Sequence, residues 1–85
     1  MPGRGTERKL SWIIRGQVLK RLRKEHTWMN QTELAAELGL LRDRFGRYEQ
    51  GSADVGEWSI NRFRKLAEVL NMDIKDVLDE FGFLD

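Results

Sequence analysis

Residues 30–51 read NQTELAAELGLLRDRFGRYEQG, and this stretch decides the fold. Asn30 followed by Glu33 is a capping-box pattern, with Asn where Ser or Thr is usual, and it places the start of a helix there. Leu34 and Leu38 then lie on one face of that helix. Gly39 interrupts the pattern, which predicts a tight turn after a short first helix.

A second helix of about three turns is expected after this turn. Leu41, Phe45 and Tyr48 repeat at the spacing of one apolar helix face, and Gly51 supplies the left-handed residue that ends the helix. Two short helices joined by a tight turn are typical of a helix-turn-helix, which sets one helix across DNA and the next into the major groove. The sequence therefore predicts double-stranded DNA as the partner.

The composition limits the class of protein. At 85 residues, the chain is expected to form one small domain with a core but without a deep enzyme cleft. Its 40% hydrophobic and 34% charged residues fit an ordinary globular protein, and it contains no cysteine. A chain without cysteine is compatible with a reducing cytosol, and no apolar run approaches the roughly 20 residues of a membrane helix. We therefore expect a cytoplasmic protein that does not enter a membrane.

Charge is distributed unevenly along the chain, although the net charge is only +1. Residues 1–50 contain 11 Lys and Arg against 6 Asp and Glu, a net charge of +5, whereas residues 51–85 contain 4 against 8, a net charge of −4. The basic half also contains the two-helix motif, which favours a polyanion bound on one face. The alternative is two solvated surfaces that happen to differ in sign.

The remaining sequence predicts three more helices, and so an all-α, compact five-helix bundle. Residues 1–10 are expected to be a flexible basic N-terminal arm, and residues 11–85 a single domain in which residues 52–58 form a loop. Ser11, Ser59 and Asp73 are expected to begin the first, fourth and fifth helices. The expected inner positions of these helices are Ile14, Val18, Leu19, Leu22, Ile60, Phe63, Ala67, Leu70, Ile74, Val77, Leu78 and Phe81.

The polar arc of the second motif helix carries groups that suit the edges of bases. Arg42 and Arg47 can each donate two hydrogen bonds to guanine, and Asp43 can accept one from the amine of cytosine. Gly46 costs roughly 1 kcal/mol of helix propensity relative to alanine, which suggests close approach of either DNA or a packed helix. An arginine-rich face alone is more often plain solvated surface. Its coincidence with the cap, the turn glycine and the apolar stripe favours base reading.

A second set of residues is expected to contact phosphates. Backbone amides at the start of the first motif helix, beside Gln31, form an anion site through the helix dipole. Basic residues on the chain's first helix would add contacts that do not depend on base sequence. The expected phosphate-contacting residues are Gln31, Thr32, Arg44, Gln50, Lys20, Arg21 and Lys24.

Over about residues 13–81 the chain resembles the Cro/repressor-type helix-turn-helix proteins, also called the XRE family. NQTELA at residues 30–35 is similar to the start of the family's second helix, and YEQG at residues 48–51 to the end of its third. KLAEVL at residues 65–70, with Met72 and Asp73, is similar to its fourth-helix signature. The resemblance implies a five-helix, lambda-repressor-like fold, DNA binding, frequent homodimers on two-fold sites, and repression or activation of transcription.

The resemblance also implies roles for individual residues. It places base reading on Arg42, Asp43, Gly46 and Arg47, and phosphate binding on Gln31. It pairs Arg23 with Glu49, for which two separately solvated side chains are the alternative. Leu41 stands where the family prefers a Ser or Thr cap, and losing such a cap costs on the order of 1 kcal/mol unless packing compensates.

Other residues favour neither catalysis nor a metal or cofactor site. His26 is the only histidine and is expected to be a plain loop residue. The acidic pairs at 73/76 and 79/80 lie on amphipathic helices, where cap and solvent roles are commoner than acid–base chemistry. We therefore expect no enzyme activity. Trp12, Trp28 and Trp58 could stack on bases, but in so small a domain they are expected to complete the edges of the core.

An interaction module is the alternative function, for example an antitoxin or a helical adaptor with the same fold. The tail EFGFLD at residues 80–85 brings two phenylalanines and a leucine together. They could form a dimer patch or a docking patch, or fold back on the core. The sequence does not choose between a phage-type repressor, a restriction controller and a general regulator, and it indicates neither the operator nor a small-molecule effector.

Overall fold

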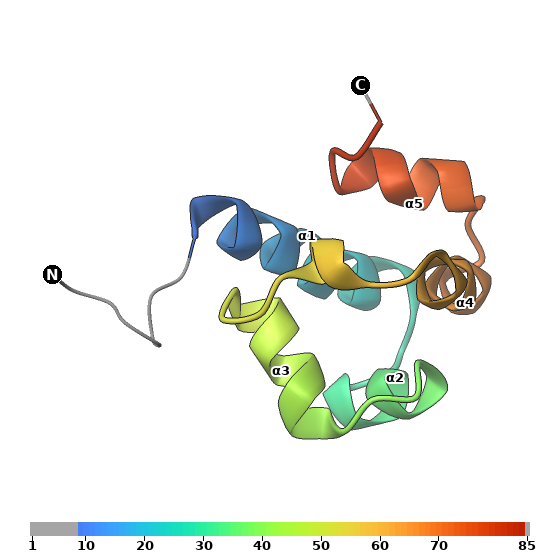
Figure 1. Cartoon of the computed structure of the whole chain (residues 1–85). Coiled ribbons are helices and arrows are strands. Elements are labelled where there is room, and N and C mark those ends of the chain that lie inside the picture. The colour runs from blue at the N-terminus through green and yellow to red at the C-terminus, as the bar shows by residue number, and fades with distance from the viewer. Residues whose placement is uncertain (1–8, 85) are drawn as a thin grey trace, which may run out of the picture.

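Helix α1 (Leu10–His26) runs through the middle of the molecule in this computed structural model, which describes residues 9–84. Helices α2 (Gln31–Glu37) and α3 (Arg42–Gln50) lie on one side of α1, and α5 (Ile74–Glu80) lies on the other (Figure 1). Helix α4 (Ile60–Leu70) stands at the end of the bundle, and the 3₁₀ helix η2 (Val55–Glu57) crosses over α1. The described residues contain no strand, so the predicted all-α, five-helix fold is confirmed.

Helix α1 begins earlier than the sequence predicted. Lys9 is its N-cap and makes no side-chain cap hydrogen bond, so Ser11 lies inside the helix and its predicted cap role is wrong. The proposed arm at residues 1–10 falls mainly outside the described residues, and its last residue already belongs to α1. The inner face of α1 also differs, because Ile14 is half exposed while Gly16 and Arg23 are buried beside Leu19 and Leu22.

The face of α1 is set by two close backbone contacts with the end of α3. A Cβ atom placed on Gly16 would lie 2.4 Å from the carbonyl oxygen of Tyr48 and 2.6 Å from that of Glu49. A Cβ atom on Gly51, whose φ is 85°, would lie 2.6 Å from the Cα atom of Ile13. Helices α1 and α3 therefore touch at a distance that only glycine permits.

The helix-turn-helix geometry follows the local signals in the sequence. The amide of Glu33 donates to Asn30 Oδ1 at 2.9 Å, and the amide of Asn30 donates to Glu33 Oε1 at 2.9 Å, so the capping box of α2 is confirmed. Gly39 turns the chain with φ of 73°, and Gly51 ends α3 in the left-handed conformation. Phe45 and Tyr48 are buried as predicted.

The prediction that Leu41 belongs to the apolar stripe of α3 is wrong. It is the N-cap of α3 with extended backbone angles, and it makes no side-chain cap hydrogen bond. Its side chain leaves the face on which Phe45 and Tyr48 lie and is 80% exposed. Packing therefore does not compensate for the missing Ser or Thr cap.

The C-terminal half agrees with the predicted caps but not with every predicted core position. Ser59 caps α4 and Asp73 caps α5, each accepting a hydrogen bond from a backbone amide of the first turn. Ile60 is exposed, contrary to the prediction, and Leu66 is buried in α4. The predicted loop at residues 52–58 contains η2, whose Val55 is fully buried.

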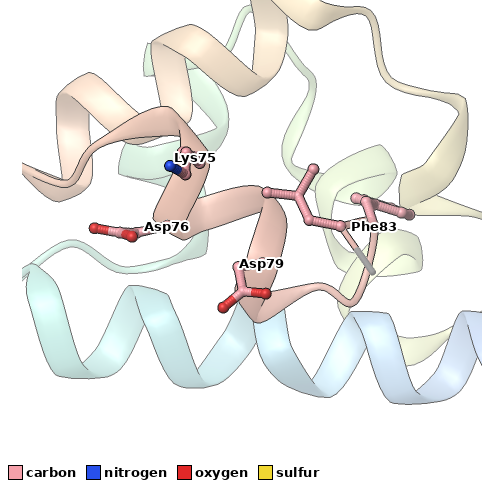
Figure 2. A pocket seen from close by; sticks show the side chains of 5 residues that line it. Lys75, Asp76, Asp79 and Phe83 are labelled. Atoms are coloured by element: carbon pink, nitrogen blue, oxygen red, sulfur yellow. The ribbon is translucent and has the colours of Figure 1, made fainter.

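The C-terminal tail folds back on the core. Gly82 has φ of 82°, and the amide of Phe83 donates to the carbonyl of Leu78 at 3.0 Å. The ring of Phe83 lies 5.6 Å from that of Phe63, with the Arg15 guanidinium 4.6 Å above it. Beside the tail is a hollow of about 530 Å³, formed with the polar side of α5 (Figure 2). The aromatic groups of the tail therefore belong largely to the core.

The prediction that all three tryptophans complete the edges of the core is wrong for Trp28. Trp58 is buried and Trp12 is partly buried, but Trp28 is fully exposed, so it does not complete the core. The loop around it is held in place, because the Thr27 hydroxyl donates to the carbonyl of Arg23 at 2.8 Å and accepts from the amide of Met29 at 3.0 Å. Among residues 9–84, no helix is long and apolar enough to cross a membrane.

Two alanine substitutions test the contact between α1 and α3. Gly16→Ala is expected to destabilise the protein by about 1–3 kcal/mol or more, because its Cβ overlaps backbone that cannot rotate away. Gly46→Ala is the matched control. Its Cβ would meet only Gln31 Oε1, at 4.0 Å, so it is expected to stabilise by roughly 1 kcal/mol through helix propensity. Urea denaturation measures both, and equal stability of the two variants would contradict the close contact.

Candidate nucleic-acid interface

The predicted base-reading residues share the outward face of α3. Arg42, Asp43 and Arg47 are exposed, and Gly46 is half exposed. At about 100° per residue, these positions and Gln50 occupy one continuous arc opposite the buried Phe45 and Tyr48. Together with Gln31 of α2 they surround a hollow of about 260 Å³. The structure thus brings all four predicted base readers together with two of the predicted phosphate-contacting residues.

Arg42 and Asp43 are paired in the free protein. Arg42 Nη1 lies 3.6 Å from Asp43 Oδ1, and both side chains are mostly exposed. An exposed pair of this kind contributes only about 0–1 kcal/mol. The two groups can therefore turn toward other hydrogen-bond partners without a large loss of stability.

Gly46 forms the open middle of this hollow. Since the only atom that its Cβ would meet is Gln31 Oε1, at 4.0 Å, no packed helix accounts for the glycine. Two explanations were offered for a glycine at this helical position, a packed helix and close approach of DNA, and the first is therefore excluded. The absence of a side chain leaves the α3 backbone open to a group that approaches from outside.

A buried hydrogen-bond network fixes the other side of the hollow. Glu49 accepts hydrogen bonds from Arg23 Nε at 2.8 Å and Arg23 Nη2 at 3.2 Å. It also accepts one from Gln31 Nε2 at 2.8 Å. Arg23 Nη1 donates in addition to the carbonyl of Met29 at 3.2 Å, just before α2. The predicted Arg23–Glu49 pair is confirmed, and the alternative of two separately solvated side chains is wrong.

Gln31 consequently has a positioning role that sequence reasoning missed. It was predicted to contact phosphate, yet its amide nitrogen holds the carboxylate of Glu49 on α3. The two residues are 18 positions apart, and no periodic or capping signal connects them. The proposed phosphate contact of Gln31 remains a prediction that would use its backbone amide.

The other predicted phosphate-contacting residues are spread over three helices. Thr32 is exposed in the first turn of α2, and Lys20 and Lys24 are exposed one turn apart on α1. Arg44 lies beyond the arc of the hollow, with its guanidinium 5.8 Å from the ring centre of Tyr48. A hydrogen bond with the Tyr48 hydroxyl raises the pKa of Arg44 above its ordinary value.

Arg21 faces away from the hollow. Its Nη2 lies 2.6 Å from Glu80 Oε1 of α5, and its Nη1 lies 3.2 Å from Glu25 Oε1. The hydrogen bond to Glu80 is the main reason that the pKa of Arg21 is raised. Because α5 lies across α1 from α3, this geometry argues against the predicted phosphate contact of Arg21 (Figure 1).

The network around Glu49 can be tested with a double-mutant cycle. Glu49→Leu and Arg23→Met are each expected to destabilise by about 3–5 kcal/mol, because each leaves a buried charge without its partner. The double variant is expected to recover much of this loss, since neither charge remains. Chemical denaturation of the four proteins gives the coupling energy. Additive losses would contradict a coupled pair.

Comparison with known proteins identifies the architecture. No family model and no curated protein matches the sequence. The crystal structure of the restriction-modification controller C.AhdI from Aeromonas hydrophila is similar with a TM-score of 0.65 and 29% identity, over 81% of this chain and 98% of that one. The clp gene regulator ClgR from C. glutamicum shares the fold with a TM-score of 0.66 and 22% identity, over 87% and 91%. With the geometry above, these likenesses confirm the predicted resemblance to the Cro/repressor-type helix-turn-helix proteins.

Proposed function

We propose that the protein is a sequence-specific DNA-binding regulator of transcription that inserts α3 into the major groove. The hollow on the outward face of α3 is the observation that carries this proposal, because it gathers arginine, aspartate and glutamine side chains around an open glycine. An α-helix with its side chains is about 10–12 Å in diameter, which suits a major groove about 12 Å wide.

Each side chain of the hollow has a partner in that groove. Arg42 and Arg47 would donate to O6 and N7 of guanine, and Asp43 would accept from N4 of cytosine. Gly46 would let base edges or a backbone approach α3 closely. The proposed phosphate contacts, which hold the register of the helix, are Gln31, Thr32, Arg44, Gln50, Lys20 and Lys24.

The functions of the two similar proteins support a regulator rather than an enzyme. C.AhdI is a restriction-modification controller and ClgR is a clp gene regulator. The likeness to C.AhdI covers 81% of this chain and 98% of that one. A regulator of transcription would act in the cytoplasm.

The alternative of an antitoxin or helical adaptor is less well supported. Its sequence argument was the aromatic tail, but Phe81 is buried and the ring of Phe83 packs 5.9 Å from that of Phe81. Only Leu84 of the tail remains an exposed large apolar side chain. A docking patch at this end would therefore use Leu84 and the hollow of about 260 Å³ that Phe83 lines with Ile60 and Leu78, rather than the rings of the tail alone.

Arg47→Ala is expected to weaken binding to a cognate duplex by about 1–3 kcal/mol and to relax preference at one base pair. Arg64→Ala is the matched control, because Arg64 is also an exposed helical arginine but lies on α4. Fluorescence anisotropy with a labelled cognate duplex and its single-base variants measures both effects. If the two variants lost the same small affinity and kept the same preference, Arg47 would not read a base.

We further propose that the protein binds DNA as a homodimer. Repeated selection from random duplex DNA is then expected to yield an inverted repeat, with half-site centres separated by about 10 base pairs or a multiple of one helical turn. Sedimentation of the complex with the selected duplex gives the number of protein chains bound. An asymmetric single site that binds one chain would contradict the homodimer.

A further inference from the structure

Leu41 is a large apolar side chain that lies exposed at the start of α3. It occupies the N-cap of α3, where it makes no side-chain hydrogen bond, and it is 80% exposed. The preceding Leu40 is partly buried and packs against the core, so the chain turns one leucine inward and the next outward. At this position α3 therefore has no side-chain cap, and the apolar side chain of Leu41 contributes little buried surface to stability.

The surroundings of Leu41 are polar. Arg42 and Asp43 follow it and line the hollow on α3. The other exposed large apolar residues lie on other elements, namely Leu10, Ile14, Trp28, Ile60 and Leu84. Leu41 is therefore the one exposed large apolar residue between Gln31 and Gln50, and it adjoins the polar residues that line the hollow.

The major groove offers one apolar group of matching size. Thymine presents its C5-methyl group there, beside hydrogen-bonding groups that arginine and aspartate can pair with on neighbouring bases. The N-terminal residues of a recognition helix are those that contact base edges. An apolar side chain at the start of α3 would reach the groove together with Arg42 and Asp43.

We propose that Leu41 is a specificity-determining residue that packs against the C5-methyl group of a thymine in the major groove. This inference rests on the proposed function, because it requires α3 to enter the groove. It adds a base preference that the polar side chains of the hollow do not supply. The binding site would contain a thymine at the position that faces the start of α3 in each half-site.

Replacing thymine by deoxyuridine removes only this methyl group. Each thymine of the selected duplex is replaced in turn, and affinity for the wild-type protein is measured by fluorescence anisotropy. One position in each half-site is expected to lose affinity about fourfold, the effect of one buried methyl group. Leu41→Ser is expected to bind the unmodified duplex more weakly and to be insensitive to the same replacement.

Two controls separate this effect from misfolding. Leu41→Ser is expected to raise the melting temperature of the free protein, because serine can cap α3, so weaker binding cannot be attributed to unfolding. Leu84→Ser makes the same chemical change on an exposed leucine of the tail and is expected to retain the deoxyuridine response of the wild type.

The outcomes distinguish this inference from the proposed function. If the wild-type protein binds selectively through Arg47 but no thymine position responds, or if Leu41→Ser responds like the wild type, the inference about Leu41 is wrong and the regulator proposal stands. If no duplex is bound selectively, the proposed function itself fails. A change in the sedimentation of free Leu41→Ser without a changed deoxyuridine response would assign Leu41 to a contact between copies and overturn the inference.

Discussion

Glu49 is a carboxylate only 6% exposed, and its need for partners constrains the arrangement of three helices. An unpaired charge at such a position would destabilise the fold by several kcal/mol. Here the charge meets two guanidinium nitrogens of Arg23 from α1 and the amide of Gln31 from α2. These three donors hold α1, α2 and α3 in register around one carboxylate. The same register turns the arc from Arg42 to Arg47 outward.

Glycine serves two opposite purposes in this arrangement. Gly16 has backbone oxygens 2.4–2.6 Å from where its Cβ would lie, so it allows α1 and α3 to touch. Gly46 has almost nothing near it, so it keeps the outer side of α3 open. Both residues interrupt a helical pattern in the sequence, where they look alike. Only the tertiary structure distinguishes a glycine needed by the fold from a glycine available to a ligand, because the difference lies in residues far along the chain.

Local signals predicted the fold well, whereas exposure at helix starts was predicted poorly. The caps at Asn30, Ser59 and Asp73 were correct because a cap involves only the next two or three residues. Leu41 and Ile60 were wrongly placed in the core. Helical side chains point toward the N-terminus, so an apolar residue at the start of a helix extends past the end that its neighbours cover. Arg21 pairs with Glu80, 59 residues away, which no periodicity indicates.

The acidic residues of the C-terminal helix and the arginines of α3 lie on opposite sides of α1 in the folded protein. Helix α5, with Asp76, Asp79 and Glu80, lies across α1 from α3, and Arg21 faces it rather than the hollow (Figure 1). Charges separated by more than about 8 Å are largely screened at physiological ionic strength. With a radius of gyration of 12.6 Å, the two faces act nearly independently on an approaching polyanion. The net charge of +1 therefore does not describe the face that carries α3, because the acidic residues of α5 lie across α1 from it.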